Sequence, residues 1–159
     1  MLHRTDKHIK FEDKDFQWQY ELCAVGLDVH SEESTAHFQT FDPDVPWLES
    51  FAGEKFEKYA ISIIKQMPGK LIPHHIDQYH FFKSKHNLND ASMIRRINIF
   101  LEDWKNGHYF EAGGKPVVEW TAGSYVVLDN TIEHMSANMG RVPKYTAQIT
   151  GLPWEGQHL

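Results

Sequence analysis

Residues 106–150 read NGHYFEAGGKPVVEWTAGSYVVLDNTIEHMSANMGRVPKYTAQIT, and no other stretch is as informative about the fold class. Short runs of β-branched and aromatic residues alternate there with glycine-containing turns, a pattern typical of strands joined by tight connections. Strands at this density, with no helical pattern between them, favour an antiparallel β fold that is closed or sandwiched. The Asn106-Gly107 step predicts a type I′ hairpin turn. The strands expected in this stretch are His108–Glu111, Val117–Trp120, Ser124–Asp129 and Lys144–Thr150.

The preceding half of the chain adds one helix and further strands. Apolar residues from Trp47 to Tyr59 approximate helical spacing, which predicts a short amphipathic helix. The segment between Gln78 and Asp90 is polar and aromatic, and it is expected to form a loop. The strands expected in this half are Ala60–Gln66, Lys70–Ile76 and Met93–Asp103.

The length of 159 residues suits one domain. We therefore predict a single domain over residues 1–159 with its core at about 60–151. The predicted fold is mainly β, a double-stranded β-helix (a cupin-like jelly roll) with one or two short N-terminal helices. An immunoglobulin-type sandwich is the alternative, but it leaves the histidine pattern described below without a purpose.

Composition and charge restrict the possible partners. Hydrophobic residues make up 41%, charged residues 24%, and the formal net charge is −6 with no cluster of Lys or Arg. These values exclude a disordered chain and speak against a nucleic-acid partner. No apolar run approaches the roughly 18 residues of a membrane span, and the first residues lack the apolar segment of a secretory signal. The single Cys23 cannot form an internal disulfide. A cytoplasmic protein with no membrane partner is expected, and its oligomeric state is open.

The segment Pro73-His74-His75-Ile76-Asp77 places an imidazole and a carboxylate two residues apart. Alternate side chains of a strand share a face, so His75 and Asp77 point to one place. With His134 they would supply two nitrogens and one oxygen, the facial triad of non-haem Fe(II) oxygenases. A His-x-Asp tripeptide is common by chance, and a hydrogen-bonded pair at a strand end is the alternative.

Lys144 follows His134 by ten residues and opens the last expected strand. A lysine facing the same cavity would suit a dicarboxylate ligand, because a buried cation needs an anionic partner. The alternative is a lysine that points to solvent, as most do. Arg141, in the turn before that strand, is the second candidate for the same task.

Together these residues resemble the Fe(II)/2-oxoglutarate-dependent dioxygenases. Residues 67–77, MPGKLIPHHID, resemble the approach to the metal strand in aspartyl/asparaginyl hydroxylase-like members. Val126-Val127-Leu128-Asp129-Asn130, leading to His134, resembles the stretch around their distal histidine. Lys144 at its ten-residue offset is more similar to prolyl 4-hydroxylases. This mixture leaves the subfamily and the substrate open.

The resemblance implies a cofactor and a co-substrate. It implies Fe(II) held by His75, Asp77 and His134, with 2-oxoglutarate as co-substrate and O₂ as the oxidant. The far carboxylate of 2-oxoglutarate would pair with Lys144. The chain would then hydroxylate an unactivated C–H bond of a small molecule or an amino-acid side chain, with release of succinate and CO₂. The alternatives are a cupin-like metalloenzyme without 2-oxoglutarate and a non-catalytic jelly-roll binding module.

The resemblance also points to Arg96 and Asn98 as contacts of the co-substrate. From the residues alone the direction of Arg96 stays undecided, because the opposite face of its strand is more apolar. Tyr79, Phe81 and Trp120 are candidates for substrate contacts or for a lid. His108, beside a predicted hairpin turn, is expected to be solvated.

Overall fold

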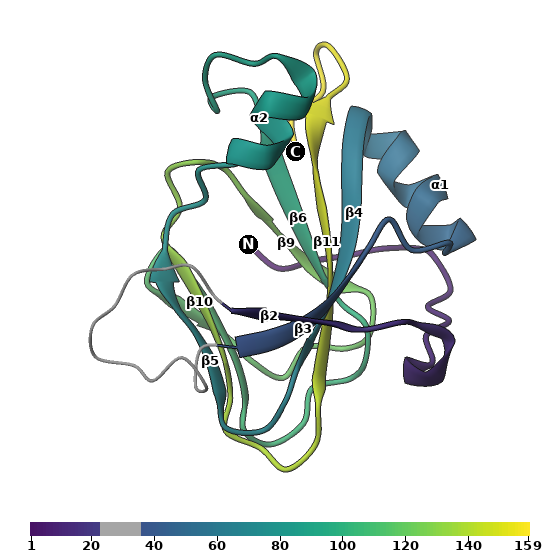
Figure 1. Cartoon of the computed structure of the whole chain (residues 1–159), viewed down its shortest axis with the longest axis vertical. Coiled ribbons are helices and arrows are strands. Elements are labelled where there is room, and N and C mark those ends of the chain that lie inside the picture. Colours follow the sequence, from purple (N-terminus) through teal and green to yellow (C-terminus); the bar gives the residue numbers. More distant parts are fainter. Residues whose placement is uncertain (23–35) are drawn as a thin grey trace.

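The computed structural model describes residues 1–22 and 36–159. Cys23, the single cysteine, lies outside the described residues. Two antiparallel sheets face each other, and Figure 1 shows α1 on the outside of the larger sheet and α2 at one end of the molecule. The mainly β jelly roll predicted from the strand and turn pattern is confirmed.

The larger sheet has the order β1-β9-β6-β11-β4-β3-β2, and the smaller sheet has the order β5-β10-β7-β8. The strands of the larger sheet are β1 (His3–Arg4), β2 (Gln19–Leu22), β3 (Ala36–Phe41), β4 (Phe56–Gln66), β6 (Arg95–Phe100), β9 (Ser124–Leu128) and β11 (Lys144–Pro153). Those of the smaller sheet are β5 (Lys70–His75), β7 (His108–Ala112), β8 (Lys115–Val117) and β10 (His134–Asn138). The helices are η1 (Asp13–Asp15), α1 (Pro46–Lys55) and α2 (His80–His86).

The central strands of the larger sheet are buried on both faces. Along β11, Tyr145, Ala147 and Ile149 join the main apolar core, which also includes the buried face of α1. The alternate residues Thr146 and Gln148 line a cavity on the other face of the sheet. The strand alternation therefore separates an apolar outer layer from a polar interior.

Two smaller apolar clusters close the interior of the jelly roll. Phe100, Phe110 and Trp120 form one of them between the two sheets. Phe82 of α2 packs with Ile94 in the other. The polar cavity is therefore flanked by well-packed side chains.

The predicted helix over Trp47–Tyr59 is too long at its C-terminal end. α1 ends at Lys55, and Phe56 is already extended, with φ of −130°. Phe56 begins β4, where it pairs with Pro153 of β11. Strand pairing therefore overrides the helical spacing of the last four residues.

The segment 78–90 was expected to be a loop, but it contains α2. α2 follows β5 and is additional to the N-terminal helices η1 and α1. Phe82 is buried in a tertiary cluster, and that contact stabilises a helix too short to be stable alone.

The prediction of a hairpin at Asn106-Gly107 is wrong. β6 pairs with β9 and β11, whereas β7 pairs with β8 and β10, so this turn connects the two sheets. His108, expected to be solvated, is buried at 3% exposure.

Two strand assignments also need correction. The strand predicted at Val117–Trp120 lies earlier, at β8, because the turn at Gly113-Gly114 pairs Phe110 with Val117. β10, which begins at His134, was not predicted as a strand. None of the helices within residues 1–22 and 36–159 has the length and apolar character needed to cross a bilayer.

Candidate metal centre

Strand register brings the two candidate histidine ligands together. His75 at the end of β5 lies directly opposite His134 at the start of β10, with ring centroids 4.3 Å apart. Asp77 lies two residues beyond the end of β5. Its Oδ1 is 3.6 Å from Nε2 of His75, and its Oδ2 is 3.5 Å from Nε2 of His134. One ligand atom of each residue lies within 4.8 Å of the other two.

Backbone hydrogen bonds orient both imidazoles. Nδ1 of His75 donates to the carbonyl oxygen of Pro73 at 2.7 Å, and Nδ1 of His134 donates to that of Ile132 at 3.0 Å. Because a carbonyl oxygen only accepts, the neutral ring keeps its lone pair on Nε2. Metal-binding histidines are commonly oriented in this way. The donor set of two Nε2 atoms and one carboxylate fits a divalent metal ion.

Asp77 is buried but remains ionised. Burial alone would raise the pKa of this carboxyl. Arg96 and the two histidines lower the pKa by more than burial raises it, so the pKa is below its usual range. Nη1 of Arg96 lies 2.7 Å from Oδ2 as an ion pair. The contact lacks hydrogen-bond alignment, and Oδ2 accepts no hydrogen bond from the described residues. An anionic oxygen is therefore available to a metal ion.

The two histidines differ in basicity. Burial lowers the pKa of His134, and the nearby Asp77 carboxylate does not compensate fully. For His75 burial also lowers the pKa, but Asp77 and the Pro73 carbonyl oxygen outweigh it, so the pKa is raised. His75 is thus the ligand at which protons compete most strongly with a metal ion.

The two histidines of the triad line a cavity of about 250 Å³ between the two sheets. His75, His134 and Ser136 line it from the smaller sheet, and Arg96 and Asn98 line it from the larger one. Oδ1 of Asn98 is buried and accepts no hydrogen bond from the described residues. The interior between the sheets thus presents two buried oxygens, Oδ2 of Asp77 and Oδ1 of Asn98, that accept no hydrogen bond from residues 1–22 and 36–159.

Lys144 is buried at 3% exposure and contacts this cavity through Ser136. Its Nζ donates to the Ser136 hydroxyl, to the carbonyl oxygen of Tyr109 at 2.6 Å and to that of Ala137 at 3.4 Å. Within the described residues it forms no ion pair with a carboxylate. Burial lowers the pKa of this amine to about 7. The solvent-exposed alternative for Lys144 does not hold.

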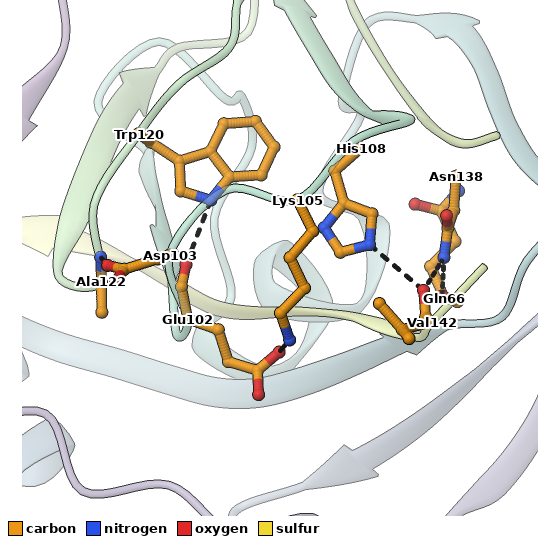
Figure 2. A network of polar contacts seen from close by, with 9 residues as sticks. All are labelled: Gln66, Glu102, Asp103, Lys105, His108, Trp120, Ala122, Asn138 and Val142. Carbon is orange, nitrogen blue, oxygen red and sulfur yellow. Dashed lines mark hydrogen bonds and ion pairs between the residues drawn. The ribbon is translucent and has the colours of Figure 1, made fainter. Parts of the chain in front are cut away.

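A polar network fixes the turn that precedes Lys144 (Figure 2). Nδ2 of Asn138 donates to the carbonyl oxygens of Gln66 and Val142, both at 2.8 Å. Nε2 of His108 donates to the same Val142 oxygen at 3.1 Å. Because Val142 lies two residues before β11, these bonds set where Lys144 enters the interior.

The remaining predicted residues lie in three different places. Tyr79 and Phe81 line a second groove, which adjoins the cavity at Arg96. Trp120 stacks on Phe100 at 3.9 Å and is 3% exposed, so the structure places it in the core and not on a lid. Arg141 is exposed in the turn before β11.

Sequence reasoning missed several polar residues of the cavity. Gln66, Ser136, Thr146 and Gln148 line it, and none was singled out. On β11, Thr146 and Gln148 alternate with Ala147 and Ile149, a signal that could have identified a polar interior.

No family model and no curated protein sequence matches the chain. Solved structures do resemble it. A Pseudomonas putida prolyl-4-hydroxylase is 12% identical with a TM-score of 0.58, covering 86% of this chain and 92% of its own. A putative sugar phosphate isomerase from Acidithiobacillus ferrooxidans is 10% identical with a TM-score of 0.52, covering 89% and 74%. KdgF from a Halomonas species is 10% identical with a TM-score of 0.50, covering 91% and 94%. These similarities define a cupin-type jelly roll and extend no further than the fold.

Proposed function

We propose that this protein is an Fe(II)- and 2-oxoglutarate-dependent dioxygenase that hydroxylates an unactivated C–H bond. The observation that carries the proposal is the triad of His75, Asp77 and His134, whose free donor atoms converge beside the cavity between the sheets. These three residues would hold Fe(II). The bound metal would supply oxygen activation coupled to conversion of 2-oxoglutarate to succinate and CO₂.

Lys144 would anchor the co-substrate. A buried amine without a carboxylate partner is costly to charge, and a carboxylate of 2-oxoglutarate would supply the missing partner. Ser136 lies between this amine and the cavity, where its hydroxyl accepts from Nζ of Lys144 and donates to Oε1 of Gln66 at 2.8 Å. Asn98 lines the cavity from the opposite sheet, and its Nδ2 would donate to the co-substrate.

Arg96 would hold the carboxylate ligand, and apolar side chains would keep water out of the cavity. Arg96 keeps Asp77 ionised and in place through the 2.7 Å ion pair. Ile64, Ile72 and Phe110 line the same cavity and limit the access of water to it. The prolyl-4-hydroxylase among the similar structures supports the proposal at the level of the fold.

One observation favours a second candidate, a cupin-like metalloenzyme that does not use 2-oxoglutarate. Nζ of Lys144 already donates to three oxygens of the protein. An amine satisfied in this way would need to exchange partners before it could bind a carboxylate. This candidate keeps the metal triad and needs no oxo acid.

Calorimetric titration of 2-oxoglutarate into Mn(II)-loaded protein separates the two candidates. For the dioxygenase we expect binding that needs the metal and is weakened at least tenfold by Lys144→Met. Fe(II)-loaded protein should then release succinate under air, and His134→Ala should not. His74→Ala is the matched control, because His74 is half exposed and pairs with Glu111 outside the cavity. Metal binding without oxo acid binding would overturn the proposal in favour of the second candidate.

A further inference from the structure

A second groove, of about 310 Å³, adjoins the candidate metal centre. It shares Gln39, Arg96 and Gln148 with the inner cavity, so the two spaces meet at these side chains. The candidate metal ligands and Lys144 do not line this groove. A molecule held in this groove would therefore lie beside the metal centre without displacing 2-oxoglutarate.

Two exposed aromatic side chains line the groove. Phe81 of α2 is 78% exposed, and Phe41 at the end of β3 is 52% exposed. The neighbouring Phe82 is buried and anchors α2, so Phe81 is presented from a fixed element. Aromatic surface left open beside a cavity is typical of a ligand site, because covering it releases bound water.

The charged side chain of the groove indicates the charge of the ligand. Among the described residues that line it there is no Asp or Glu, and Arg96 is the one permanently charged side chain of that set. Nη1 of Arg96 pairs with Asp77, and Nε donates to the hydroxyl of Thr150 at 3.0 Å. The guanidinium lies 5.1 Å from the ring centre of Tyr79. No hydrogen bond from Nη2 to the described residues is formed, so this nitrogen still has N–H donors to offer.

We propose that this groove binds the substrate, and that the substrate is an amphipathic carboxylic acid. Its apolar group, about the size of one aromatic ring, contacts Phe41 and Phe81, and its carboxylate accepts hydrogen bonds from Nη2 of Arg96. A cationic ligand finds no acidic partner among the described lining residues and is rejected. The assignment of this ligand as a substrate rests on the proposed function, whereas its binding does not.

Three probes of equal shape test the proposal: 3-phenylpropionate, 3-phenylpropanamide and 3-phenylpropylamine. Their binding to the metal-free full-length protein is measured by ligand-observed NMR titration. We expect the acid to bind at least tenfold more tightly than the amine, with the amide between them. Equal affinity of the acid and the amine overturns the proposal.

Variants locate the binding. Phe81→Ala should weaken binding of 3-phenylpropionate about tenfold, because apolar contact area is lost. Ser84→Ala, an exposed position on the same helix, should leave the affinity unchanged. Arg96→Gln should abolish the preference for the acid over the amide. An unchanged affinity in Phe81→Ala overturns the proposal.

Lys144→Met distinguishes this proposal from the proposed function. It should leave 3-phenylpropionate binding intact and weaken 2-oxoglutarate binding to the Mn(II)-loaded protein. If Lys144→Met weakens the phenylpropionate instead, the probe occupies the inner cavity and the groove assignment is wrong. If 2-oxoglutarate never binds while the acid selectivity persists, the proposed function fails and the groove remains a carboxylate site.

Discussion

Both imidazoles of the candidate metal centre are held by the same local contact. In His75 and in His134, Nδ1 donates to the carbonyl oxygen two residues earlier, so each ring is oriented within its own segment. Asp77 has no such local bond, and its orientation depends on Arg96 of the other sheet. The carboxylate is therefore the ligand whose position depends most on long-range packing.

Asp77→Asn tests the carboxylate ligand. The amide keeps the shape of the side chain but loses the anionic oxygen, and it leaves Arg96 without its partner. We expect the affinity for Mn(II) to fall about 100-fold or more, measured by equilibrium titration with detection of free Mn(II) by electron paramagnetic resonance. Asp44→Asn, at an exposed position, is the control and should bind Mn(II) as the wild type does. Similar affinities in both variants would contradict the role of Asp77.

The lowered pKa of Lys144 predicts how the unfolding free energy depends on pH. Its pKa is about 7 in the folded protein and near 10.5 when unfolded, so between these values the unfolded chain binds more protons. The contribution of Lys144 to stability therefore rises with pH in this window. Relative to Lys144→Met, the unfolding free energy of the wild type should increase by about 2 kcal/mol from pH 7 to pH 9 in urea titrations. Parallel pH profiles of the two proteins would show that Lys144 has an ordinary pKa.

At the scale of elements, the turn between β6 and β7 packs against the turn between β10 and β11. The amide of Met139 donates to the carbonyl oxygen of Gly107 at 2.7 Å. The bonds of Asn138 and His108 to Val142 lie beside this contact (Figure 2). Close approach of the two turns fixes the start of β11, and with it Lys144.

Gly107→Ala should disturb this junction. Gly107 has φ of +89°, and a Cβ there would lie 2.3 Å from the amide nitrogen of Gly140. Backbone strain and the clash together should cost about 3 kcal/mol of unfolding free energy, measured by chemical denaturation. Gly69→Ala is the matched control, since Gly69 has φ of +79° but open space around its Cβ. We expect it to cost only about 1 kcal/mol; equal losses would show that the turns do not pack tightly.

At the scale of the whole molecule, the metal triad comes from the smaller sheet, and Arg96 and Lys144 come from the larger one. The interior is therefore polar on both sides, and the apolar core lies mainly outside the larger sheet, against α1. Burial of Asp77 and Lys144 in this interior costs desolvation free energy. A bound metal ion should relieve part of that cost.

Metal binding should accordingly stabilise the fold in a pH-dependent way. At 100 times its dissociation constant, Mn(II) should add about 2.7 kcal/mol to the unfolding free energy and raise Tm by several degrees in thermal scans. The pKa of His75 is raised, so protons begin to compete above pH 6.5, and the gain in Tm should shrink as pH falls through that value. Asp77→Asn should show no gain at any pH. A gain in Tm that is undiminished at pH 5 would contradict the assignment of His75 as a ligand.

The sequence predicted the class of fold and the candidate ligands, but not the direction of the side chains. The spacing of His75 and Asp77 pointed to the pair, although Asp77 lies beyond the end of β5 and its orientation depends on Arg96. The direction of Arg96 was ambiguous because Ile97 and Ile99 suggested that their own face was the only buried one. The structure buries both faces, and Arg96 lines the cavity. Nothing local in residues 80–86 indicated α2, which depends on burial of Phe82.

Alternating residues and glycine turns are properties of neighbouring positions, so the strands, the jelly roll and the His-x-Asp pair could be read directly from the chain. Convergence of His134 with that pair required the register between β5 and β10, and the burial of Lys144 required the packing of β11 against the smaller sheet. These features arise from contacts between residues distant in sequence. Their free energy depends on the assembled sheets, which no short segment encodes.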